Sequence, residues 1–137
     1  MPITACIRVF VVEDHAPYRE FIMSVVQSRS ELQVIAQAAD GTEAVRIAEE
    51  LRPDLILLDI GLPGLNGIEA ARRILPLSPQ SKILFVSQES SQELVSEALS
   101  TGASGYVLKA DAGSELMAAV NCVLLGEKFM SSSISTG

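Results

Sequence analysis

Five polar residues of this sequence each stand just past the end of an apolar run that has the composition of a buried strand: Glu13, Asp14, Asp59, Ser87 and Lys109. Asp59 is the most informative, because it closes the uninterrupted apolar run 55–58. An unpaired carboxylate is costly to bury, so we expect Asp59 to emerge into a polar site at the carboxyl edge of a sheet. Two more acids, a hydroxyl and an amine at other strand ends would complete that site.

The three acids predict a metal site. Glu13, Asp14 and Asp59 would repel one another at short range unless a cation lay among them. Hard oxygen ligands favour Mg²⁺, which keeps several waters and usually binds one or two carboxylates together with a substrate phosphate. Lys109 would then offer a positive charge to a phosphate oxygen, and Ser87 a hydroxyl donor. Asp59 itself can act as a nucleophile that forms an aspartyl phosphate.

Alternating strands and helices must position these side chains. The apolar runs predict strands at residues 7–12, 32–39, 55–58, 83–86 and 106–108. A helical pattern follows each strand. The first helix follows Asp14 and has Phe21, Ile22, Val25 and Val26 on its buried face, the second runs from a cap at Thr42 to a stop at Pro53, and the third follows Gly67 and ends before Pro76. The fourth runs from Ser90 or Ser91 to near Gly102, and the fifth begins at about Ala112.

This alternation predicts an α/β fold. Strands that are apolar throughout, each followed by a helix, form a parallel sheet covered on both faces. Five such units are too few for an eight-stranded barrel, so we expect an open, doubly wound, five-stranded parallel sheet of order 2-1-3-4-5, the flavodoxin-like arrangement. Ligands of such sheets bind where the winding reverses, here between the first and third strands. Glu13, Asp14 and Asp59 flank that point.

Composition sets further bounds. The 137 residues, 48% of them hydrophobic, suit one domain with an ordinary core. A formal net charge of -7 argues against a nucleic-acid-binding surface on this segment. No apolar stretch approaches the ~18 residues that span a bilayer, and the N-terminus lacks the pattern of a signal peptide, so we expect a cytoplasmic protein without membrane contact. Cys6 and Cys122 are expected to be free thiols that serve as packing residues.

The order of these features resembles the receiver domain of two-component response regulators, from Ile7 to about Gly126. The resemblance rests on an acidic pair after the first strand, a central Asp followed by Pro63 and Gly67, a Ser after the fourth strand and a Lys after the fifth. Each feature is common alone, but their joint occurrence in this order at strand ends is specific.

The resemblance implies a role for each site residue. Asp59 would be the phosphoacceptor, assisted by Lys109 and Ser87. The implied Mg²⁺ ligands are the side chains of Glu13, Asp14 and Asp59 and the backbone carbonyl of Gly61. The chain would then accept a phosphoryl group from a sensor histidine kinase and assist its own phosphorylation and dephosphorylation, without being an enzyme in the ordinary sense.

The resemblance also implies a conformational switch. Ser87 would turn its hydroxyl toward the phosphoryl group, and Tyr106 occupies the family's aromatic switch position. Inward movement of that ring would alter the output surface formed by the fourth helix, the fifth strand and the fifth helix. Phosphorylation-linked homodimerisation through this surface is implied by resemblance alone.

Three segments, residues 61–74, 40–44 and 126–129, resemble the NarL/FixJ (LuxR-type) class of response regulators. Members of that class usually carry a C-terminal helix-turn-helix domain that binds DNA, and none is present in this chain. We therefore expect a receiver domain at residues 1–126 and a linker stub or tail at 127–137. The chain would be either a receiver cut from a longer transcription regulator or a stand-alone receiver.

Gln88 departs from the family, in which the residue after the switch Ser is usually small. Gln88 and Glu89 are expected at the rim of the site, where they would affect phosphorylation rates, and His15 is expected to be a rim side chain. Two alternatives stay open. One is a degenerate receiver that binds partners without phosphorylation. The other is a flavodoxin-like module for a flavin or nucleotide, which Glu13 and Asp14 disfavour because they would repel the ligand's phosphate.

Overall fold

The computed structural model describes residues 6–134 and has a single parallel sheet at its centre. Its strands run in the order β2-β1-β3-β4-β5-β6, with all neighbours parallel. The strands are β1 (Ile7–Val12), β2 (Leu32–Ala38), β3 (Leu55–Leu58), β4 (Lys82–Ser87), β5 (Gly105–Leu108) and β6 (Phe129–Met130). The predicted α/β class and the predicted order of the first five strands are confirmed, whereas the predicted total of five strands is one short.

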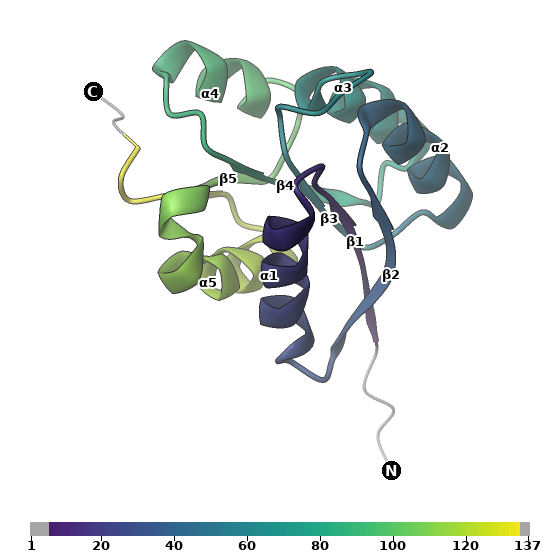
Figure 1. The fold of residues 1–137 in the computed structure, drawn as a ribbon, viewed down its shortest axis with the longest axis horizontal. Helices are drawn as coiled ribbons and strands as arrows, with labels where there is room; N and C mark the ends of the chain where they lie inside the picture. Colours follow the sequence, from purple (N-terminus) through teal and green to yellow (C-terminus); the bar gives the residue numbers. More distant parts are fainter. Residues whose placement is uncertain (1–5, 135–137) are drawn as a thin grey trace.

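Five α-helices and one short 3₁₀ helix connect the strands. They are α1 (Ala16–Gln27), α2 (Gly41–Leu51), α3 (Gly67–Leu77), α4 (Gln92–Leu99), the 3₁₀ helix η1 (Lys109–Asp111) and α5 (Ala112–Leu124). Helices α1 and α5 lie on one side of the sheet, and α2, α3 and α4 lie on the other (Figure 1). The sheet is therefore buried on both faces, which explains why its central strands are apolar without alternation.

Two hydrophobic cores separate along the two faces of the sheet. Because successive side chains of a strand point to opposite faces, Phe10 and Ile56 belong to the core under α2, α3 and α4. Val11 and Leu57 belong to the core under α1 and α5. The strand ends are consequently held rigidly from both sides, and the loops that leave them carry the polar residues.

Three local predictions were wrong. The cap of α2 is Asp40 rather than Thr42, because the Asp40 side chain accepts a hydrogen bond from the Glu43 backbone N–H. Helix α3 runs through Pro76 to Leu77, since a proline in the last turn removes only one hydrogen bond. On α1, Ile22 and Val26 are buried but Phe21 is exposed.

The sixth strand arises from residues that were expected to form a linker or tail. Phe129 pairs with Gly105, and Met130 pairs with Tyr106. Gly105 permits this approach, because a Cβ at that position would lie 2.8 Å from the Phe129 carbonyl oxygen. Beyond the strand, the buried Ser131 accepts a hydrogen bond from the Leu108 backbone N–H at 2.9 Å.

The chain then crosses the edge of the sheet. Ser132 donates a hydrogen bond to Glu115 and Ser133 donates one to Asp111, both near the start of α5. Ile134 is buried in the core on the opposite face, the one that α4 covers. Residues 129–134 therefore form a strap over the exposed edge of β5.

Two other expectations concern cysteines and membranes. Cys6 and Cys122 are both free thiols. Cys6 is exposed rather than packed in the core, because it precedes the first residue of β1, where its thiol contacts the Gln33 side chain. Within residues 6–134, every helix is too short or too polar to cross a membrane.

Candidate functional site

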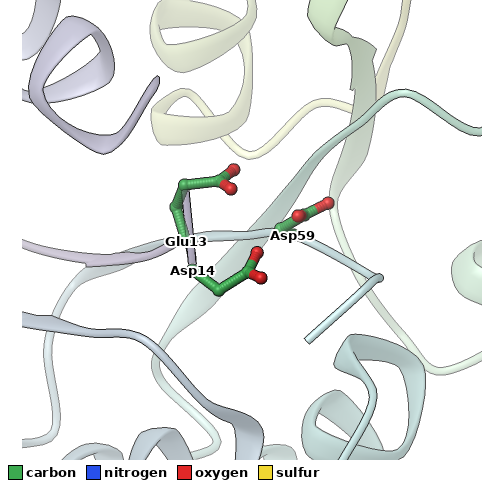
Figure 2. A group of neighbouring side chains, drawn as sticks. All are labelled: Glu13, Asp14 and Asp59. Carbon is green, nitrogen blue, oxygen red and sulfur yellow. The ribbon is translucent and has the colours of Figure 1, made fainter. Parts of the chain in front are cut away.

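Strand register brings the three acids together. Val12 of β1 lies beside Leu58 of β3, so the residues that follow them, Glu13 and Asp59, leave the sheet side by side. The Asp59 backbone N–H donates to the Val12 carbonyl and fixes this alignment. Figure 2 shows Glu13 and Asp14 at the end of one strand and Asp59 at the end of its neighbour, with all three carboxylates gathered at one edge.

The acids differ in burial and in hydrogen bonding. Glu13 is fully buried, and its Oε2 accepts the His15 backbone N–H at 3.0 Å. Asp59 is 6% exposed, and its Oδ1 accepts the Ile60 backbone N–H at 2.8 Å. Asp14 is exposed to solvent. Glu13 and Asp59 are thus the buried acids of the site, and Asp14 is its solvent-exposed acid.

Lys109, directly after β5, supplies the positive charge of the site. Its Nζ lies 2.8 Å from Glu13 Oε1 and 3.3 Å from Asp59 Oδ2. Burial raises the pKa of Glu13, and the nearby charge of Asp59 adds to this, although contacts with Lys109 and the His15 N–H oppose it. Burial alone would lower the pKa of Lys109, but the two carboxylates outweigh that effect and raise it. Lys109 therefore stays protonated as the counter-ion of the acids.

A surface cavity of about 620 Å³ opens over these groups. Its lining contains nine residues that were predicted for the site or its rim: Glu13, Asp14, His15, Asp59, Gly61, Ser87, Gln88, Glu89 and Lys109. Tyr18 and Ala110 complete the lining. The structure thus brings together all the predicted site residues except Tyr106, which lies behind the cavity.

Ser87 and Tyr106 are linked through the loop after β4. Ser87 Oγ accepts the Glu89 backbone N–H at 3.1 Å, and the Tyr106 hydroxyl donates to the Glu89 carbonyl at 2.7 Å. The Tyr106 ring is fully buried and lies against Phe85. Burial raises the pKa of Tyr106, while its contact with Ser87 acts in the opposite direction. Movement of the Glu89 backbone would therefore disturb the hydrogen bonds of both side chains.

The acidic cluster has the donor chemistry of a divalent-cation site. Glu13, Asp14 and Asp59 can each direct one carboxylate oxygen so that these atoms lie within 4.8 Å of one another. Such a group of hard oxygen ligands fits Mg²⁺ or Ca²⁺ better than a metal that prefers nitrogen or sulfur. Gly61 also lines the cavity, but its carbonyl as a fourth ligand remains a prediction.

Asp14 allows a test of this electrostatic arrangement. Replacing Asp14 with asparagine removes one of three clustered negative charges, so without a divalent ion the variant should melt roughly 3 °C higher than wild type. The same change should weaken Mg²⁺ binding by at least about tenfold, because a ligand is lost. Thermal unfolding and magnesium titration would measure the two effects.

The matched control is Glu49→Gln, which removes the same charge from an exposed position on α2 that lies outside the cluster and the cavity lining. It should leave the affinity for Mg²⁺ unchanged. Equal effects of the two substitutions on magnesium binding would show that overall charge, and not the cluster, attracts the ion.

Sequence analysis missed the part that Tyr18 plays in this site. Its hydroxyl donates to the Lys109 carbonyl at 3.1 Å, and Lys109 Nζ lies 4.7 Å from the centre of its ring. The available signal was an aromatic residue in the first turn of the helix that follows the acidic pair.

Comparisons with known proteins agree with the fold. Residues 9–121 match the response regulator receiver domain. The chain therefore belongs to the response regulator receiver family.

Its curated relatives place it among the NarL/LuxR-type regulators. It is 36% identical over 124 residues to the transcriptional regulatory protein DegU of Brevibacillus brevis, a match that covers 90% of this chain and 52% of DegU. It is 35% identical over 129 residues to the response regulator GacA of Pseudomonas viridiflava, with 94% of this chain and 60% of GacA covered. The chain thus spans about half to three-fifths of the length of these relatives.

A solved structure gives the same assignment. The LuxR-family two-component response regulator from Aurantimonas sp. SI85-9A1 superposes with a TM-score of 0.90 at 35% identity, covering 95% of this chain and 93% of that one. The predicted family and class are therefore confirmed.

Proposed function

We propose that this chain is the phosphoacceptor module of a two-component response regulator and that Asp59 carries the phosphoryl group. The observation behind the proposal is the single cluster of three carboxylates and one lysine ammonium at the carboxyl ends of β1, β3 and β5. Asp59 lines the cavity, accepts the Ile60 backbone N–H through Oδ1 and pairs with Lys109 through Oδ2. Glu13 has similar contacts, so the choice of Asp59 as acceptor rests on its match to the central aspartate of the receiver family.

The proposed reaction is a transfer between two nucleophiles. A carboxylate oxygen of Asp59 attacks the phosphorus of a phosphohistidine on the donor kinase, a P–O bond forms, the P–N bond breaks, and the imidazole leaves with its electron pair. A bound Mg²⁺ would supply charge that offsets the repulsion between phosphoryl oxygens and the acids. Lys109 is placed to leave Glu13 and donate to a phosphoryl oxygen.

Ser87 and Tyr106 are proposed to couple phosphorylation of Asp59 to a conformational change at the protein surface. If Ser87 turns its hydroxyl to the phosphoryl group, it releases the Glu89 N–H, and the Tyr106 contact with the carbonyl of the same residue can then adjust. To change the ratio of active to inactive conformations from ~1:99 to ~99:1, phosphorylation must stabilise the active conformation by roughly 5.5 kcal/mol relative to the inactive one. Charge-assisted hydrogen bonds contribute about 1.5 to 3 kcal/mol each, so two or three new ones suffice.

The biological setting is part of the proposal. The relatives named above are transcriptional and response regulators, so we propose that a sensor histidine kinase is the donor and that the output is control of transcription. DNA contact would then occur through a further domain rather than through this acidic chain, with phosphorylation favouring a homodimer. A cytoplasmic location remains a prediction.

Incubation with acetyl phosphate and Mg²⁺, followed by intact-mass measurement, tests the proposal. We expect a gain of about 80 Da, the mass of one phosphoryl group, that disappears when EDTA is present from the start. A parallel titration with beryllofluoride and Mg²⁺ should shift the amide NMR signals of the Asp59, Ser87 and Lys109 loops. A folded protein with neither response would be a degenerate receiver, and a yellow purified protein would favour the flavin-binding alternative.

Gln88 is expected to slow access to the site. Its side chain is exposed at the cavity rim, where it narrows the approach of a phosphodonor or of water. Gln88→Ala should therefore raise the rates of phosphorylation by acetyl phosphate and of later hydrolysis by about threefold each, equivalent to roughly 0.7 kcal/mol in barrier height. Rates equal to those of wild type would show that Gln88 does not control access.

A further inference from the structure

We infer that Tyr18 is a positioning residue for Lys109, an inference that rests on the proposed function. Tyr18 lies in the first turn of α1, and Lys109 lies directly after β5. The two residues are 91 positions apart in the sequence. The fold brings them together at the cavity wall, where both line the site.

Tyr18 contacts both the backbone and the side-chain ammonium of Lys109. The tyrosine hydroxyl donates to the Lys109 backbone carbonyl at 3.1 Å. The ammonium of the same lysine lies 4.7 Å from the centre of the Tyr18 ring, within the range of a cation–π interaction. Tyr18 therefore holds the backbone from which the lysine side chain starts and the charged group in which it ends.

These contacts restrict a side chain that is otherwise mobile. A lysine ammonium sits on a flexible four-carbon stem and can turn to water. Glu13 and Asp59 attract it from within the site, and the Tyr18 ring covers a further side. If Lys109 leaves Glu13 for a phosphoryl oxygen, the ring can stay in contact with it during that short movement. The phosphoryl group then meets a cation that is already in place.

The Tyr18 hydroxyl is suited to a permanent anchoring role. Burial and the charges of Glu13 and Asp59 raise the pKa of Tyr18 to about 12. The hydroxyl thus stays protonated near neutral pH and can donate to the Lys109 carbonyl. The neighbouring ring of Phe21, 5.4 Å away between centroids, is partly exposed and does not line the cavity.

Three substitutions separate the two contacts. Tyr18→Phe keeps the ring and removes the hydroxyl, and should lower the rate of phosphorylation by acetyl phosphate by no more than about threefold. Tyr18→Leu removes both contacts, and should lower that rate and the affinity for beryllofluoride with Mg²⁺ by about tenfold. Phe21→Leu removes the adjacent ring only, and should leave both values within about twofold of wild type.

A double-mutant cycle distinguishes positioning from simple support of the fold. In a Lys109→Met background there is no ammonium to hold, so Tyr18→Leu should cause little further loss of phosphorylation rate. Thermal unfolding defines a temperature at which every variant is folded for the comparison. An equal loss in both backgrounds would overturn the positioning role and assign Tyr18 a purely structural one.

A measurement independent of phosphorylation keeps the two proposals apart. The Tyr18 ring should shift the NMR signals of the Lys109 Hε protons upfield in the wild type and in Tyr18→Phe, but not in Tyr18→Leu. If the wild type shows this shift and yet gains no phosphoryl group, the proposed function fails, although the contact exists. If it gains the phosphoryl group without the shift, the inference about Tyr18 fails alone.

Discussion

Asp59→Asn is expected to abolish phosphorylation of this chain. The amide nitrogen of asparagine cannot act as the carboxylate nucleophile, and its oxygen is far less nucleophilic, so the gain of about 80 Da after treatment with acetyl phosphate and Mg²⁺ should disappear. Asp59 is buried at the cavity floor, and loss of its charge also leaves Lys109 paired with Glu13 alone. Intact mass and a tryptic map of the wild-type phosphoprotein would locate the group.

Asp54→Asn is the matched control, because it makes the same chemical change just before the opposite end of β3. Asp54 accepts the Arg8 backbone N–H, a bond that the asparagine oxygen can retain. This variant should take up the phosphoryl group as wild type does. Continued phosphorylation of the Asp59→Asn protein would move the acceptor to another residue and refute the assignment.

Gly67→Ala should destabilise the fold by about 3 kcal/mol or more, lowering the melting temperature by roughly 10 °C. Gly67 is the first residue of α3, and its backbone N–H donates to the Ile60 carbonyl at 2.7 Å. A Cβ at this position would overlap the Asp59 carbonyl oxygen and contact the Ile60 Cα at 2.8 Å. Because these are backbone atoms, the helix must move away from the end of β3, which carries Asp59.

Gly113→Ala provides the comparison. Gly113 is also in a helix, near the start of α5, but a Cβ there would have no neighbour within 4 Å. Alanine should leave stability unchanged or raise it by up to about 1 kcal/mol, since it favours the helix. Urea unfolding of both variants measures the difference, and a Gly67→Ala protein as stable as wild type would show that α3 is free to shift.

Much of the fold could be predicted because the local signals and the tertiary structure agree. Uninterrupted apolar strands and regularly spaced helices require a parallel sheet with two covered faces, and the two cores have that arrangement. The capping error at α2 was avoidable, since Asp40 followed by Glu43 three residues later is a capping-box spacing. Phe21 was misplaced because helical periodicity does not say how wide the buried face is.

The sixth strand could not be foreseen from its own residues. Phe129 and Met130 follow a glycine turn and precede a run of serines, a composition that indicates a loop. They become a strand because β5 offers an unpaired edge and Gly105 leaves room beside it. Those conditions depend on residues more than twenty positions earlier.

The candidate site was predictable to the extent that it follows strand ends. The carboxyl ends of parallel strands meet at one edge, which is why Glu13, Asp14 and Asp59 could be grouped in advance. The contacts of Tyr18 with Lys109 depend instead on how α1 sits against the start of η1. No spacing along the chain carries that information.

The strap at residues 129–134 brings the chain back across the edge of the sheet after α5. Ile134, at the end of this strap, is buried in the core that α4 covers. The Ser131 hydroxyl accepts a hydrogen bond from the backbone N–H of Leu108, the residue that precedes Lys109. Because Leu108 adjoins Lys109, a movement at the end of β5 that accompanies a change at the lysine would also act on the strap through this hydrogen bond.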